Sequence, residues 1–74
     1  MKMKKTSNFA LRLKKYRIQA GLTQKELAKL ICSTNTSISN WEQGVSVPSD
    51  TVVLVLSQVL GISPVKLKEV SADV

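Results

Sequence analysis

Helix start and stop signals follow one another so closely in this chain that they leave room only for short helices. Thr23 and Glu26 form a capping box, in which the threonine hydroxyl can accept from the amide of Glu26 and the glutamate can reach back to the amide of Thr23. Thr34 is the next good N-cap, and Gly44 and Gly61 are typical helix stops. The helix that begins after Thr23 must therefore end just before Thr34, and only two or three residues join it to the next helix.

Apolar residues between these signals repeat at intervals of three and four, which places them on one face of each helix. The inward positions are Phe9, Leu13, Tyr16 and Ala20 in the first segment, Leu27, Ala28 and Ile31 in the second, Ile38 and Trp41 in the third, and Val53, Leu56, Ser57 and Leu60 in the fourth. Residues 51–56 have the β-branched composition of a strand, but a cap at Ser49 and a stop at Gly61 favour a helix. A fifth helix opens at Ser63 and Pro64 and runs to about Val70. The pattern predicts one all-α domain of five helices.

The residue types that the sequence lacks exclude several classes of function. Cys32 is the only cysteine and the chain has no histidine, so an internal disulfide is excluded and a zinc site is disfavoured. The sequence also lacks a nucleophile–histidine pair, a phosphate-binding glycine loop and a cluster of carboxylates. We therefore expect no enzymatic activity, no metal or cofactor and no small-molecule ligand.

Basic residues dominate the first part of the chain. The formal net charge is +6, and the cations concentrate at Lys2, Lys4, Lys5, Arg12, Lys14, Lys15 and Arg17. Such a distribution attracts polyanions such as nucleic acid or an anionic membrane, or it simply forms a solvated face. No apolar segment follows the basic start, and no apolar run is long enough to span a bilayer. We therefore expect a cytoplasmic protein with a reduced cysteine.

The second and third helices, joined by a tight connection, predict a helix-turn-helix. On the third helix, the sides away from Ile38 and Trp41 carry only short, neutral hydrogen-bonding side chains, which are Thr36, Asn40 and Gln43, flanked by Asn35 and Ser39. A face that only keeps a protein soluble usually carries lysine and glutamate. Asparagine and glutamine can bond to adenine N6 and N7 in the major groove, and threonine and serine to bases or phosphates. The pattern favours DNA binding, although such residues are also common on small protein surfaces.

Four motifs occur in order along the chain. They are LTQKELA at residues 22–28, ISNWEQG at 38–44, PS at 48–49 and LGIS at 60–63. Together they resemble the phage repressor/Cro-like helix-turn-helix family, also called the XRE family, over about residues 9–67. The resemblance implies a five-helix lambda-repressor-like DNA-binding domain, with the helix-turn-helix formed by helices 2 and 3. It also implies a transcriptional regulator, expected to be a repressor, that binds a pseudo-palindromic operator through the major groove.

The resemblance further implies roles for individual residues. Base contacts are expected from Asn35, Thr36, Ser39 and Asn40, and contacts to the DNA backbone from Thr23, Gln24, Thr34, Ser37 and Gln43. Arg17 and Glu42 match a family pair that forms a salt bridge between the first helix and the recognition helix. Glu42 thereby has a structural rather than a catalytic role.

Two positions and one loop depart from the family pattern. Cys32 stands where a glycine is usual, and Ser33 where a valine is common. We expect Cys32 to act as a small buried hydrophobic residue, with redox sensing as the alternative. The loop at residues 45–47 lacks the basic residues that family members often place there. The basic start of the chain either compensates by contacting DNA or is only a disordered tail.

A second apolar stripe on the fourth helix indicates that two chains associate. In a monomer, this stripe and Leu67 on the fifth helix would be exposed to solvent, whereas a two-fold interface between two chains would cover them. The predicted interface residues are Val52, Val55, Val59 and Val65. A few such residues are also normal on a monomer's surface. The predicted organisation is a flexible basic arm at residues 1–7, a Cro/C1-type helix-turn-helix domain at 8–70 and a flexible tail at 71–74.

Two other function classes stay open. A protein-interaction module, such as an antitoxin or adaptor, could use the same fold, because fold does not determine function. A basic amphipathic first helix could act at an anionic membrane, but its apolar face has few strong anchors. We expect double-stranded DNA and a second copy of the chain as partners, and no membrane.

Overall fold

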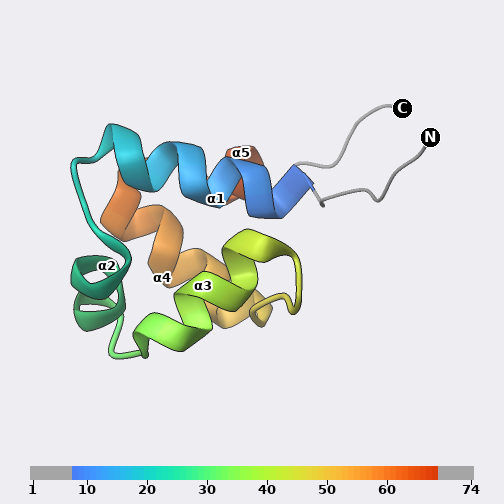
Figure 1. Cartoon of the computed structure of the whole chain (residues 1–74). Coiled ribbons are helices and arrows are strands. Elements are labelled where there is room, and N and C mark those ends of the chain that lie inside the picture. The colour runs from blue at the N-terminus through green and yellow to red at the C-terminus, as the bar shows by residue number, and fades with distance from the viewer. Residues whose placement is uncertain (1–7, 69–74) are drawn as a thin grey trace.

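The computed structural model describes residues 8–68, and all regular structure in that range is helical (Figure 1). The elements are α1 (Asn8–Gln19), α2 (Gln24–Leu30), α3 (Asn35–Gln43), α4 (Asp50–Leu60) and α5 (Pro64–Lys68). The predicted all-α class with five helices is confirmed. The predicted basic arm, the C-terminal tail and the end of the last helix near residue 70 lie outside the described residues.

The helix ends follow from their capping residues. The hydroxyls of Thr23, Thr34 and Ser49 accept from the backbone amides three residues on, at 3.0, 3.0 and 3.3 Å. Glu26 Oε1 accepts in turn from the amide of Thr23 at 2.8 Å, which completes the predicted capping box. The cap at Ser49 outweighs the β-branched composition of residues 51–56, which are helical as predicted.

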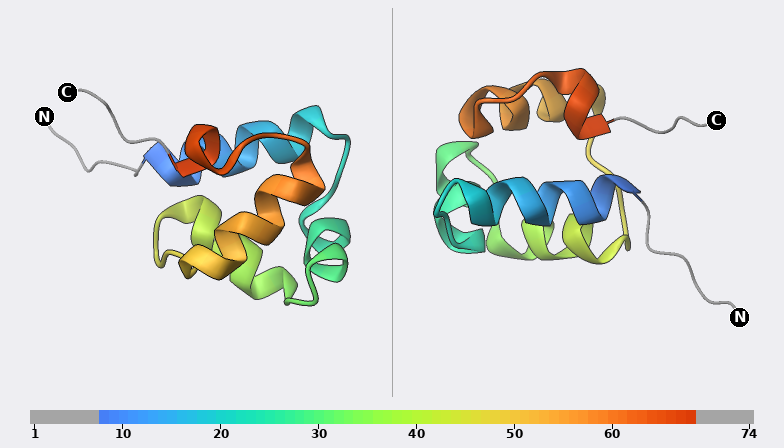
Figure 2. Two further views of the ribbon diagram at one scale, coloured as in Figure 1. Left: turned by 180° about the vertical axis from the view of Figure 1, so that it is seen from behind. Right: turned by 90° about the horizontal axis from the view of Figure 1, so that it is seen from above.

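One apolar core joins all five helices. Its most deeply buried side chains include one from each helix, namely Leu13, Leu27, Ile38, Leu56 and Leu67, with Ala28 and Val53 beside them. Full burial of one such leucine or isoleucine stabilises the fold by about 1.5–3 kcal/mol. Helix α1 packs against α3 and α5, α2 packs against α3, and α4 packs against α5. Seen from above, α3 lies beneath α1, and α4 and α5 lie together to one side of them (Figure 2).

Two predictions about single core positions are wrong. Ala20 is exposed because α1 already ends at Gln19, and the fully buried alanine of this helix is Ala10, near its start. Leu67, which was predicted to be exposed to solvent in a monomer, is fully buried. The reason is that α5 packs against both α1 and α4, so this residue enters the core between them.

The second apolar stripe of α4 is less exposed than predicted. Val52 and Val59 are partly buried and pack against the core. Val55 is 37% exposed, its neighbour Leu54 is 51% exposed, and Val65 on α5 is 74% exposed. The accessible apolar surface of α4 and α5 is therefore made by Leu54, Val55 and Val65, a set that includes only two of the four predicted interface residues.

Candidate nucleic-acid interface

Helices α2 and α3 form the predicted helix-turn-helix. In the turn, the amide of Ser33 donates to the carbonyl of Ala28 at 2.8 Å, and the amide of Cys32 donates to the carbonyl of Lys29 at 3.2 Å. These hydrogen bonds satisfy carbonyls at the end of α2. Thr34 then caps α3 directly. The short turn fixes the direction in which α3 leaves α2.

Cys32 is exposed, so the expectation of a buried hydrophobic residue is wrong. Its φ is 57°, in the left-handed region that favours glycine. The residue type preferred at this position is therefore determined by the backbone conformation at the helix end and not by packing. The sequence carries a signal for this, because Cys32 replaces the glycine that is usual at this point of the motif.

Helix α3 separates an apolar inward face from a polar outward surface. Ile38 is fully buried, and Trp41 is partly buried against the core. The polar side chains predicted to contact DNA from this helix all remain accessible, some fully and some in part, and they are Asn35, Thr36, Ser37, Ser39, Asn40 and Gln43. The structure thus brings all four predicted base-contacting residues together on one helix.

Some of these polar side chains bond to each other. Thr34 Oγ1 donates to Ser37 Oγ at 3.0 Å, and Gln43 Nε2 donates to Ser39 Oγ at 2.6 Å. These pairs were not predicted, although spacings of three and four residues on a helix or its cap are a sufficient signal for them. Their polar atoms are partly satisfied before any DNA is bound.

A charged cluster behind α3 joins the first three helices. Arg17 bonds to Glu42 through two nitrogens, with Nε to Oε2 at 2.5 Å and Nη2 to Oε1 at 3.1 Å. A third nitrogen, Nη1, donates to the carbonyl of Leu22 at 2.7 Å, in the connection between α1 and α2. The side chain of Glu42 is only 3% exposed and that of Arg17 is 11% exposed. This is the ion pair that the family resemblance implies, and its paired geometry fixes the position of α3 relative to α1.

Gln24 belongs to the same cluster. Its Nε2 donates to Glu42 Oε1 at 3.1 Å, so the first residue of α2 is also connected to α3. This amide is predicted to contact a DNA phosphate, whereas its bond to Glu42 was not predicted. An amide nitrogen has two hydrogens, which leaves one for a phosphate oxygen while the bond to Glu42 persists.

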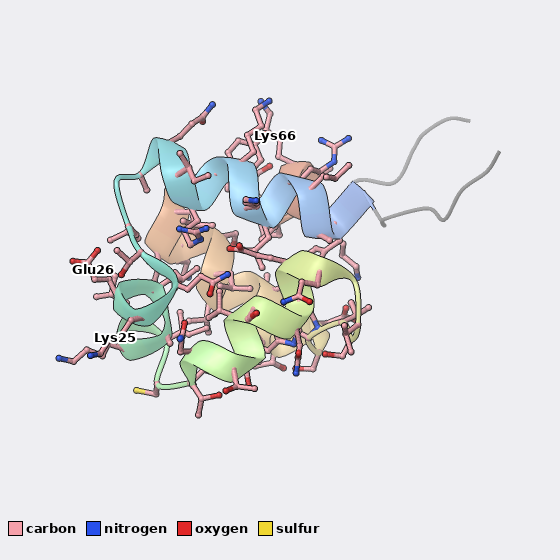
Figure 3. The ribbon with its side chains drawn as sticks, viewed as in Figure 1. Lys25, Glu26 and Lys66 are labelled. Atoms are coloured by element: carbon pink, nitrogen blue, oxygen red, sulfur yellow. The ribbon has the colours of Figure 1, made fainter. Side chains whose placement is uncertain are left out.

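The exposed charged side chains of the described residues lie on helices other than α3. Helix α3 contains no lysine or arginine, and its one carboxylate is that of the buried Glu42. Lys25 and Glu26 project from α2, whereas Lys66 lies on the side of α1 and α5 (Figure 3). The outward surface of α3 can therefore exchange hydrogen bonds with a ligand but contributes no net charge.

Two further features are absent from the part of the chain that the structure describes. Residues 8–68 contain no group of three His, Cys, Asp or Glu side chains that could hold a metal ion. Within the same range, no helix is long and apolar enough to cross a membrane.

Comparison with known proteins identifies the family. A family model described as helix-turn-helix matches residues 13–67. No curated protein sequence matches the chain significantly. Among solved structures, the restriction-modification controller protein C.AhdI from Aeromonas hydrophila is similar with a TM-score of 0.78 and 31% identity, over 84% of this chain and 90% of that one.

Two further similar structures were solved in complex with an operator or with DNA. The P22 c2 repressor in complex with a synthetic operator has a TM-score of 0.76 and 30% identity, over 80% of this chain and 89% of that one. SinR, a master regulator for biofilm formation, in complex with DNA has a TM-score of 0.75 and 28% identity, over 80% of this chain and 95% of that one. Since the family model covers most of the chain and the fold of these regulators is shared, the chain belongs to the XRE-type helix-turn-helix family.

Proposed function

We propose that the chain binds double-stranded DNA sequence-specifically and regulates transcription, acting as a repressor when it occupies its operator. The observation that carries this proposal is the outward surface of α3, which presents uncharged hydrogen-bonding side chains on a helix held firmly by its neighbours. The DNA-bound structures of the P22 c2 repressor and SinR support it. Such a regulator acts in the cytoplasm, where its operator lies.

The proposed contacts fall into two groups. Contacts to the sugar–phosphate backbone fix the register of the protein on DNA, and base contacts specify the sequence. The proposed backbone contacts are Thr23, Gln24, Thr34, Ser37 and Gln43, and the proposed base contacts are Asn35, Thr36, Ser39 and Asn40. The exposure of Asn35 and Thr36 near the start of α3 supports a docking in which this end of the helix enters the major groove.

The proposed regulator is a homodimer. Leu54 and Val55 on α4 and Val65 on α5 supply the accessible apolar surface for a two-fold interface. Val52 and Val59 would lie at its base, because they are already partly buried in the core. A dimer of this kind holds two recognition helices about 34 Å apart, which matches half-sites one helical turn apart on the same side of DNA.

Sedimentation tests the dimer. Leu54→Lys should shift the protein to monomer, because a charge is placed within the proposed interface. Leu11→Lys is the matched control, since Leu11 on α1 is 57% exposed and Leu54 is 51% exposed. Leu11→Lys should leave the dimer intact. A wild-type protein that stays monomeric at high micromolar concentration, both free and on its operator, would contradict this part of the proposal.

Selection of bound sequences from a randomised DNA pool tests the function. We expect an enriched inverted repeat, bound about 10³-fold or more above random DNA when both are titrated at two salt concentrations. Weak binding to all sequences with a steep salt dependence would show that positive charge attracts DNA but that α3 does not recognise bases. That outcome would favour a protein partner at the same surface.

A further inference from the structure

Helix α3 lacks the side chains that most often recognise G·C pairs. Its sequence, NTSISNWEQ, contains no lysine or arginine, the residues that bond bidentately to guanine O6 and N7. A carboxylate can accept from cytosine N4, but Glu42 is only 8% exposed and is bound to Arg17. Neither contact is available from α3, and the groups that remain are amides and hydroxyls.

Hydrogen bonds divide these amides and hydroxyls into two groups. Thr34 bonds to Ser37, and Gln43 bonds to Ser39, so these four side chains already have partners. Within residues 8–68, the outward polar side chains of α3 that make no hydrogen bond are those of Asn35, Thr36 and Asn40. A polar group that loses water in the groove needs a partner there, because an unsatisfied buried donor or acceptor is costly. The second group therefore depends most on the identity of the bases.

Thr36 and Asn40 are neighbours on the helix surface. They lie four residues apart, and side chains at this spacing have Cβ atoms about 5–6 Å apart. This distance corresponds to one or two base steps, since bases along a strand are about 3.4 Å apart. Thr36 and Asn40 can therefore contact base pairs that are adjacent or nearly so, with Asn35 at the edge of the same block.

The chemistry of these two side chains selects A·T pairs. An asparagine amide accepts from adenine N6 and donates to adenine N7 at the same time, and the methyl group of threonine packs against the methyl group of thymine. We propose that α3 recognises a block of A·T pairs in each half-site, with an adenine against Asn40 and a thymine against Thr36. This inference rests on the proposed function and adds the class of operator sequence that the protein binds.

The adenine contact is tested on the full chain with the operator obtained by selection. Each adenine of the half-site is replaced in turn by 7-deazaadenine, which lacks the N7 acceptor but still pairs with thymine. At one position we expect the wild-type protein to lose about 5- to 150-fold in affinity. The Asn40→Ala variant should bind the operators with adenine and with 7-deazaadenine at that position with the same affinity. Gln43→Ala is the control, because Gln43 lies on the same helix but already bonds to Ser39. This variant should lose as much affinity as the wild type when adenine is replaced by 7-deazaadenine.

The thymine contact is tested with deoxyuridine, which lacks only the methyl group. Thr36→Val keeps a methyl group at the same place and loses the hydroxyl, so its affinity should still fall when thymine is replaced. Thr36→Ser keeps the hydroxyl and loses the methyl group, so it should no longer distinguish the two bases. Neither change alters charge, and the slope of affinity against salt concentration should remain that of the wild type.

The outcomes separate this inference from the function on which it rests. An enriched inverted repeat with G·C pairs at the positions where Asn40→Ala relaxes selection would overturn the A·T assignment and leave DNA binding intact. Equal sensitivity of the wild type and Asn40→Ala to 7-deazaadenine at every position would do the same. A selection with no enriched motif would overturn the proposed function and this inference with it. Thermal melts confirm that each variant is folded before its binding is compared.

Discussion

Replacing Cys32 with glycine should stabilise this protein. Cys32 lies between α2 and α3 with a φ of 57°, a conformation in which the Cβ of an L residue comes too close to the following carbonyl oxygen. Its side chain is exposed, so removing it opens no cavity in the core. At the ends of α3 and α4, the chain has glycines in the same region, Gly44 at φ 78° and Gly61 at φ 73°.

Two opposing terms determine the size of the effect. Removing the Cβ relieves about 1–2 kcal/mol of left-handed strain. Glycine has more freedom in the unfolded chain, and this lowers the free energy of unfolding by about 0.5–1 kcal/mol. The net gain in the free energy of unfolding should therefore be about 0.75 kcal/mol, within a range of about 0–1.5 kcal/mol. For a domain of this length, a gain of about 0.75 kcal/mol raises Tm by about 3–6 °C.

Urea and thermal unfolding followed by circular dichroism measure the difference between the wild type and Cys32→Gly. All samples need a reductant and the same protomer concentration, because the proposed dimerisation would make Tm depend on concentration. Cys32→Ala is the control, since it removes the sulfur but keeps the Cβ, and it should stay close to the wild type. Equal stabilisation by alanine would assign the effect to the thiol. A glycine variant less stable than the wild type would refute the argument from the backbone.

Three further predictions follow from other contacts. Glu42→Ala should lower the free energy of unfolding by about 3–5 kcal/mol, because it leaves the guanidinium of Arg17 largely buried without its partner; a loss under about 1 kcal/mol in urea unfolding would contradict this. Leu67→Ala should cost about 2–5 kcal/mol by the same assay, since Leu67 is fully buried, and a near-neutral result would show that α5 is not packed on the core. The hydrogen bond and the charge of Lys68 hold the pKa of Asp50 below its ordinary value of 3.8. The resulting stabilisation is present above pH 3.8 and is lost as pH falls through the lowered pKa. Asp50→Asn should therefore make the free energy of unfolding depend less on pH in that acid range. An unchanged pH dependence would disprove the coupling between Asp50 and Lys68.

Helix boundaries were the most predictable part of the fold because they depend on local chemistry. A cap such as Thr23 or Ser49 acts on amides within three residues of itself, so the sequence alone contains both partners. The same holds for the residues of α3, whose inward and outward positions follow from helical periodicity. Ile38 is buried and Thr36 is exposed, as that periodicity requires.

Positions that depend on contacts between helices were harder to predict. Leu67 looked like surface because its burial requires α5 to fold back between α1 and α4, which no local pattern encodes. The bond of Gln24 to Glu42 was not predicted, because the two residues are 18 positions apart in the sequence. Cys32 differs from its prediction for another reason, because its apolar character predicts burial whereas the position is determined by a left-handed backbone conformation.

The arrangement of charge on α3 separates the positioning of the helix from the recognition of DNA. The bond of Glu42 to Arg17 and Gln24 is largely buried, and a buried ion pair often stabilises a fold no more than apolar residues would. Its directional geometry nevertheless matters, because a helix turned by one residue position rotates by about 100° and would turn Asn40 away from the proposed DNA-contacting surface. Apolar contacts alone tolerate such adjustment better than paired hydrogen bonds do. In the proposed complex with DNA, Glu42 would therefore contribute to specificity by fixing the position of α3, while the uncharged side chains on the outward surface would form the hydrogen bonds that depend on the base.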